Sequence, residues 1–222
     1  GEQGNLPQFE SKNGCTSIPL EFEPYGSMFV IFRKGIPNSV SESQNNTRAN
    51  FPKLEPIQEL KGSWMVQFDP QWFYPTSGLN DDQSKGKIVF DKLEDWSNRP
   101  ESAIKYFSGK AVYRQIFQMH PKIQGQRLFI DLGPVKGTAK VTFNNKDLGV
   151  VWCYPWRVEI TDVVKPGENS LEIEVVNLWP NRLIGDAKLP ADQRRTWNRY
   201  ATNPNLPLLP SGLLGPVKIL GD

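Results

Sequence analysis

The sequence predicts an all-β fold, a β-sandwich of antiparallel strands. Four short stretches within residues 127–186 place apolar side chains at every second position, and the clearest of them alternates Leu171, Ile173 and Val175 with glutamates. A period of two puts one face of a strand on a core and the other face in water. The stretches are separated by turn-forming sequences, namely Asn144-Asn145-Lys146-Asp147 and Lys165-Pro166-Gly167-Glu168-Asn169. Because these turns are short, we expect tight reversals between the strands rather than crossover helices.

We assign the sandwich to residues 51–222, and the same alternation predicts its strands in chain order. They are expected at Trp64, Val66 and Phe68, and then at residues 88–93, 108–117, 128–132, 139–143, 158–160, 171–175 and 216–220. Residues 75–86 have the composition of a polar loop. One helical turn is expected at residues 191–198, because Pro190 suits the first position of a helix.

Residues 1–50 are expected to form a β-hairpin and a linker that remain from an upstream domain. The hairpin is predicted at residues 15–33, with alternating apolar side chains on its first strand and a turn at residues 24–27. A polar, turn-rich linker follows it at residues 35–56. The sequence starts at Gly1 without an initiator Met or the features of a signal peptide, so we expect a piece of a longer protein.

Composition limits the partners that the chain can have. Its 222 residues, of which 38% are hydrophobic, can fill the core of one large β domain but not of two. The formal net charge of +2 comes from 26 basic and 24 acidic residues spread along the chain, which leaves no basic stripe for nucleic acid. No apolar run approaches the ~20 residues that cross a bilayer. We therefore expect neither nucleic-acid binding nor membrane insertion.

Two cysteines, Cys15 and Cys153, are too few for a disulfide scaffold or a thiolate metal cage. They could pair with each other if the hairpin lies against the strand before Trp156. Two buried free thiols are the equally supported alternative.

Several fragments of the sandwich resemble the sugar-binding-like β-sandwich of large bacterial glycoside hydrolases. The order of the elements is similar to that in the galactose-binding-like jelly roll of family-2 glycosidases. The ending at residues 177–186, together with residues 212–217, is similar to the C-terminal region of the α-L-rhamnosidase-like family. The fragments that carry the resemblance include Trp64-Met65-Val66-Gln67-Phe68-Asp69-Pro70, Tyr106-Phe107-Ser108-Gly109-Lys110-Ala111-Val112-Tyr113-Arg114, Asp131-Leu132-Gly133 and Asn177-Leu178-Trp179-Pro180-Asn181-Arg182-Leu183-Ile184-Gly185-Asp186, together with residues 144–149, 160–161, 165–169 and 211–217.

The resemblance covers residues 57–222 and implies a galactose-binding-domain-like jelly roll that follows a hairpin of an upstream domain. Such enzymes hold their catalytic carboxylates on a separate, larger barrel, and this chain has neither the length nor the helix–strand alternation of a barrel. The implied function is a noncatalytic carbohydrate-binding or accessory domain of a bacterial glycoside hydrolase, periplasmic or secreted. Its implied partners are a glycan or polysaccharide and the catalytic domain of the parent enzyme. An interdomain docking module without a ligand, or an independent hydrolase, are the alternatives.

Acidic residues offer little support for catalysis. Glu172 and Glu174 lie about 7 Å apart on one strand face, a spacing that hydrolysis of a glycoside would permit, but their alternation with apolar residues favours a solvated face. A structural Ca²⁺ is conceivable among nearby acids, although exposed loop acids are the favoured interpretation; these are Asp81, Asp82, Asp91, Glu94 and Asp95. His120 is the only histidine, which excludes a histidine-based metal cage and disfavours a Ser-His-Asp triad. No catalytic residue and no cofactor are predicted.

Aromatic residues are the better candidates for a ligand site. Trp152, Tyr154 and Trp156 cluster around Pro155, and a second group, Trp72-Phe73-Tyr74, precedes Pro75. An aromatic ring can stack on the apolar face of a pyranose, but such rings also fill sandwich cores. We expect Trp64 and Trp179 in the core and leave Trp152 and Trp156 open between the two roles.

Arg182 and Asp186 complete the candidate ligand-binding set. They could hydrogen-bond a sugar. An internal Arg–carboxylate brace that orders the following loop is favoured, because the planar guanidinium matches a carboxylate.

Overall fold

The computed structural model describes residues 6–24, 26–32, 49–51, 53–74, 81–119, 126–198 and 201–222. Contacts divide the chain into two compact units, Gly1–Glu55 with Asp222 and Pro56–Gly221. The sequence placed a boundary at residue 50, and the origin of the first unit in an upstream domain stays a prediction.

The first unit contains a short hairpin of β1 (Glu10–Lys12) and β2 (Cys15–Ser17). Asn13 and Gly14 form its turn with φ of 53° and 77°, the positive values that a two-residue hairpin turn requires. The hairpin predicted at residues 15–33 is therefore misplaced, since residues 18–24 and 26–32 lie outside any strand. Asn-Gly is a stronger hairpin signal than the proline turn at residues 24–27. Tyr25 and residues 33–48, most of the predicted linker, lie outside the described part.

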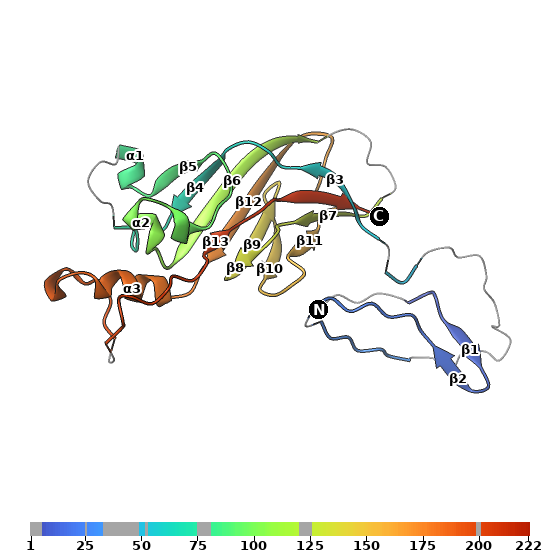
Figure 1. The fold of residues 1–222 in the computed structure, drawn as a ribbon. Coiled ribbons are helices and arrows are strands. Elements are labelled where there is room, and N and C mark those ends of the chain that lie inside the picture. The colour runs from blue at the N-terminus through green and yellow to red at the C-terminus, as the bar shows by residue number, and fades with distance from the viewer. Residues whose placement is uncertain are drawn as a thin grey trace. The chain divides into compact units, whose positions relative to one another are not determined.

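The second unit is a β-sandwich, which confirms the predicted fold class (Figure 1). Its larger sheet has six strands in the order β10-β9-β12-β6-β4-β5, and its smaller sheet has four in the order β11-β7-β14-β3. A separate pair joins β13 to β8. The bounds are β3 Glu55–Glu59, β4 Trp64–Phe68, β5 Lys87–Phe90, β6 Lys110–Met119, β7 Leu128–Asp131, β8 Val135–Lys136, β9 Thr138–Phe143, β10 Lys146–Val151, β11 Arg157–Glu159, β12 Gly167–Val176, β13 Gly212–Leu213 and β14 Lys218–Gly221.

The alternation of β12 sets the core. Leu171, Ile173 and Val175 are buried, while the glutamates between them face outward and are only partly covered. Ile173 lies opposite Tyr113 of β6 and Val141 of β9, both fully buried, so three neighbouring strands share one inner face. The Tyr113 hydroxyl accepts a hydrogen bond from Trp96 Nε1 at 2.6 Å, and its burial raises the pKa of this phenol.

The predicted turns are present. Asn144 and Asn145 have φ of 47° and 66° between β9 and β10. Asn144 also donates to Asn169 Oδ1 at 2.7 Å, and Asn169 donates to the carbonyl of Lys165 at 2.7 Å. One asparagine network therefore holds both reversals at this end of the sheet.

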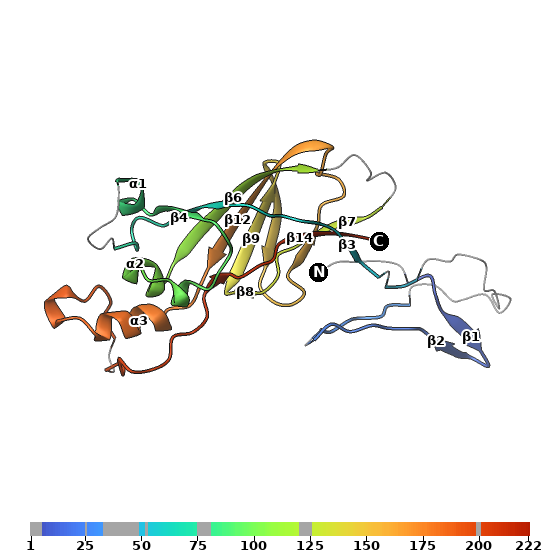
Figure 2. The same cartoon turned by 45° about the horizontal axis from the view of Figure 1, so that its top comes forward.

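Short helices gather at the other end of the sandwich. They are α1 (Asp81–Ser84), η1 (Trp96–Asn98), α2 (Ser102–Lys105), α3 (Pro180–Ala187) and η2 (Ala191–Gln193). In Figures 1 and 2, α2 and α3 lie side by side; Gly185 permits this, because a Cβ there would stand 2.6 Å from Cγ of Tyr106. The helical turn expected at residues 191–198 is only η2, and α3, which begins at Pro180, was not predicted. No helix in the described ranges is long and apolar enough to span a membrane.

Replacing Ile173 with alanine should lower the free energy of unfolding by about 2 to 5 kcal/mol, because it opens a cavity in a fully buried position. Glu172→Ala is the matched control on the same strand. It should cost less than about 1 kcal/mol, since it removes only an exposed ion pair. Chemical denaturation measures both, and equal losses would show that β12 is buried on both faces.

Candidate functional site

A groove of about 310 Å³ lies at the helical end of the sandwich. Four segments line it: β8 with Gly137, the loop between β10 and β11, the start of α3, and the segment before β13. Their lining residues are Val135, Lys136, Gly137, Trp152, Trp156, Leu178, Pro180, Asn181, Leu209, Pro210 and Ser211. The groove therefore contains two of the three aromatic residues that the sequence singled out around Pro155.

The aromatic wall is the loop at residues 152–156, which crosses from the edge strand of the larger sheet to the edge strand of the smaller one. Trp152 is 71% exposed and Tyr154 is 48% exposed, whereas Trp156 is partly buried against the core. The carbonyl of Trp156 accepts a hydrogen bond from Leu132 N at 2.8 Å, which anchors the end of the loop. Trp152 is thus a surface ring, Trp156 packs against the core and also lines the groove, and Tyr154 does not line the groove.

The cysteines do not match the buried alternative. Cys153, within this loop, and Cys15 in the first unit are both exposed free thiols. Trp152, Cys153 and Tyr154 are therefore three consecutive exposed residues of this loop.

Another part of the lining is apolar and comes from Leu178, Pro180, Leu209 and Pro210. Gly137 forms part of the floor with φ of 137°, and a Cβ there would stand 2.0 Å from the carbonyl oxygen of Val176. Only glycine allows the chain after β8 to approach the end of β12 this closely.

The neutral polar residues of the groove are occupied by internal hydrogen bonds. Asn181 donates from Nδ2 to the carbonyl of Leu209 at 2.7 Å and accepts from Leu209 N at 2.8 Å. Asn181 and Asn177 both donate to Ser211 Oγ, at 3.1 and 3.2 Å. These amides hold the segment 209–211 in place and have little capacity left for a ligand.

Asn177 and Ser108 connect this clamp to the sandwich. Asn177 accepts from Gly109 N at 2.9 Å and donates to the carbonyl of Phe107 at 2.9 Å. Ser108 Oγ donates to the carbonyl of Leu178 at 2.8 Å and accepts from Arg182 N at 3.3 Å. The end of β12 and the start of α3 are thereby fixed to the start of β6.

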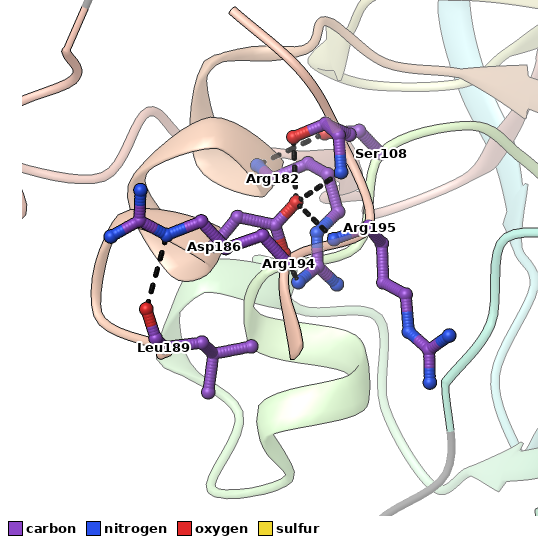
Figure 3. A network of polar contacts seen from close by, with 7 residues as sticks. Ser108, Arg182, Asp186, Leu189, Arg194 and Arg195 are labelled. Carbon is purple, nitrogen blue, oxygen red and sulfur yellow. Dashed lines mark hydrogen bonds and ion pairs between the residues drawn. The ribbon is translucent and has the colours of Figure 1, made fainter. Parts of the chain in front are cut away.

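Arg182 and Asp186 form the brace that the sequence favoured (Figure 3). They pair one turn apart on α3, with side chains that are 8% and 4% exposed. Asp186 also accepts from Thr196 N at 2.7 Å, from Thr196 Oγ1 at 2.6 Å and from Arg195 N at 3.1 Å. Burial alone would raise the pKa of Asp186, but the bonds from Thr196 and Arg182 outweigh it and lower this pKa below its ordinary value of 3.8. A sugar contact of either residue stays a prediction.

The second aromatic group has mixed roles. The guanidinium carbons of Arg182 and Arg195 lie over the ring of Tyr74, 5.4 and 4.9 Å from its centroid. The rings of Trp72 and Trp179 pack edge to face, with their centroids 5.4 Å apart. Trp64 is buried as predicted, but the prediction of Trp179 in the core is wrong, because its position at the exposed start of α3 leaves it 50% accessible.

The acidic candidates are paired or serve the backbone. Glu172 binds Arg114 at 2.7 Å and Glu174 lies 3.5 Å from Lys110. Asp91 is exposed as expected. The other two acids after β5 are not free loop acids, since Glu94 pairs with Arg99 at 2.8 Å and Asp95 accepts from Ser97 N and Ser211 N.

Within the described ranges, no group of three or more metal-binding side chains comes together. Asp82 is exposed, while His120 and the side chain of Asp81 lie outside the part that the structure describes.

Comparison with known proteins identifies the sandwich. The family described as glycosyl hydrolase 2 galactose-binding domain-like matches residues 66–205. A protein of Formosa agariphila that bears the provisional name beta-glucuronidase is 39% identical over 191 residues, which cover 74% of this chain and 16% of that protein. The resemblance predicted from the sequence is confirmed.

Solved structures agree with this assignment. A rhamnosidase from Novosphingobium sp. PP1Y is similar over 96% of this chain, with 32% identity and a TM-score of 0.80, and the match covers 19% of that enzyme. A β-glucuronidase from Ruminococcus gnavus shares the fold over 77% of this chain, with 17% identity and a TM-score of 0.52. The chain thus spans about a fifth or less of the length of the Formosa and Novosphingobium relatives.

Replacing Asp186 with alanine should destabilise the second unit by about 3 to 5 kcal/mol at neutral pH, because Arg182 would stay buried without its partner. Acid should remove the same contribution from the unmodified chain. Since folding lowers the pKa of Asp186, its contribution is complete above the unfolded value of 3.8 and is lost as the pH falls through the lower folded pKa.

Urea titrations at several pH values test this expectation. The difference between the unmodified chain and Asp186→Ala should narrow in acid. Asp147→Ala, which breaks an exposed ion pair with Lys140, is the control and should have little effect. A difference between the chains that does not depend on pH would show that the brace is not electrostatic.

Proposed function

Because the chain belongs to the glycosyl hydrolase 2 galactose-binding domain-like family, we propose that it is a noncatalytic β-sandwich domain of a bacterial glycoside hydrolase and binds glycan in the groove beside Trp152. Its proposed partner is the catalytic domain on the same polypeptide of the parent enzyme, and its proposed ligand is a glycan or polysaccharide. The proposed location is the periplasm or the exterior of the cell. The bacterial sources of the relatives support this setting.

The noncatalytic role is supported by the state of the carboxylates. Hydrolysis of a glycoside needs two carboxyl groups that face one sugar, one of them able to give or take a proton. Glu172 and Glu174 of β12 are held by cations on the outer face of the sheet, and Asp186 accepts hydrogen bonds from Thr196 N and Thr196 Oγ1. The relatives are several times longer than this chain, which leaves room for a catalytic domain elsewhere in the parent protein.

Glycan binding rests on one observation, the exposed ring of Trp152 on the wall of a groove. An indole that is 71% accessible contributes little to the core, yet it can stack on the C–H face of a sugar ring. Trp156 extends the aromatic wall inward. Because a shallow groove buries few ligand atoms, the affinity should be weak, on the order of mM to tens of µM.

An interdomain docking module is the second candidate, and a different observation favours it. Among the described residues between 178 and 209, five large apolar side chains are exposed, namely Leu178, Trp179, Trp197, Leu206 and Leu209. Exposed apolar side chains of this size suit burial against another domain of the parent enzyme.

The purified chain should not hydrolyse aryl glycosides, including aryl α-L-rhamnoside and aryl β-D-glucuronide, because its paired glutamates cannot act as acid and base. Release of the aryl alcohol is the measurement. Hydrolysis that is lost on Glu172→Gln or Glu174→Gln would instead identify an independent hydrolase.

Trp152→Ala and Trp156→Ala should each weaken glycan binding, since each removes stacking area that is worth about 1 kcal/mol or more. Titration calorimetry against rhamnose- and galactose-containing oligosaccharides measures this, with circular dichroism as the folding control. Trp197→Ala, an exposed tryptophan that does not line the groove, is the matched variant and should bind normally. If no oligosaccharide binds, or if both groove variants bind unchanged, the docking module is the better interpretation.

A further inference from the structure

We infer that the groove selects acidic sugars, and that Lys136 is the residue that recognises their carboxylate or sulfate group. This inference rests on the proposed glycan-binding function and adds the chemical class of the ligand.

The charge of the groove is the first observation. Lys136 is the one ionisable residue of its lining, which includes no carboxylate. Lys136 is exposed, and no ion pair or hydrogen bond of its ammonium group is formed within the described residues. Lys140, four residues later in the sequence, forms an ion pair with Asp147, with 2.9 Å between Nζ and Oδ2. On β6, Nζ of Lys110 lies 3.5 Å from Oε2 of Glu174. The groove thus has an available positive charge, whereas Lys140 and Lys110 lie beside carboxylates.

The backbone of Lys136 is held firmly. β8 pairs with β13, so that Lys136 lies opposite Gly212 and Val135 opposite Leu213. Val135 and Leu213 are buried, so the alternation of the strand turns Lys136 away from the core. The next residue, Gly137, is fixed against the end of β12 by its close approach to Val176. A flexible side chain on a fixed backbone can place its ammonium group on a ligand anion.

The rest of the lining explains why a charge matters here. Trp152 and Trp156 offer stacking surfaces, but a stacked ring alone discriminates little between sugars. Asn181 and Ser211, the neutral polar residues of the lining, are engaged with Leu209 and with each other. Lys136 is therefore the lining side chain that remains to orient a ligand, and a compact cation recognises a carboxylate or a sulfate.

Calorimetric titration of the folded chain with matched oligosaccharides tests the inference. One pair is a glucuronate-containing tetrasaccharide and its carboxyl-reduced form, and the other is a sulfated tetrasaccharide and its desulfated form. We expect at least one acidic sugar to bind about three to ten times more tightly than its neutral form. This preference should shrink when the ionic strength rises from about 0.02 M to about 0.5 M. The pair with the larger preference distinguishes a carboxylate from a sulfate ligand.

Lys136→Gln should abolish the preference while binding of the neutral form stays unchanged. Lys146→Gln is the matched control, because Lys146 is also exposed but lies at the far end of β10 from the groove, about 17 Å along the strand. Equal binding of the acidic and neutral forms, or a preference that survives Lys136→Gln, would overturn the inference and leave the proposed function standing. Failure of every oligosaccharide to bind would overturn both.

Discussion

The buried amide of Asn177 is the interaction on which the functional end of the molecule depends. It lies where β12 ends, and it bonds the start of β6 through Gly109 and Phe107 and the segment before β13 through Ser211. Three chain segments that are far apart in sequence meet at this one side chain. Since a buried amide that loses a partner costs about 1 to 3 kcal/mol, the arrangement has little freedom to shift. Asn181 and the Arg182–Asp186 brace extend the same rigidity along α3.

This clamp also determines the chemical character of the groove. Holding the segment 209–211 in place engages the amide of Asn181 and the hydroxyl of Ser211, so these groups do not converge on a ligand. What remains on the surface is apolar wall, two indoles and one ammonium group. Arg182 and Asp186, for which the sequence favoured an internal brace over a sugar contact, pair with each other because residues one helical turn apart lie on the same face of a helix.

Local periodicity was enough to predict the sandwich but not its functional end. The strand at Leu171, Ile173 and Val175 follows directly from a period of two, which the environment of a half-buried sheet imposes. Helix α3 was not predicted, although Pro180 occupies the first helical turn, where proline is favoured. Trp179 was expected in the core, yet its burial depends on the direction in which the chain leaves β12. Lys136 carried no signal, because a single lysine acquires meaning only when the fold shows which residues surround it.

The composition of the groove has an energetic consequence for both candidate functions. An apolar wall and an exposed indole can gain free energy by covering either a sugar face or another domain, and area alone does not separate the two. The charge of Lys136 separates the two functions. Burying an unpaired ammonium group under an apolar domain surface is costly, whereas an acidic sugar pairs with the ammonium group and leaves it partly hydrated. Trp152 and Lys136 on the sandwich side favour a solvated ligand, and the exposed apolar residues of the segment 178–209 favour a protein surface. Because Leu178 and Leu209 belong to both sets, a docked domain that covers them would form one side of the groove.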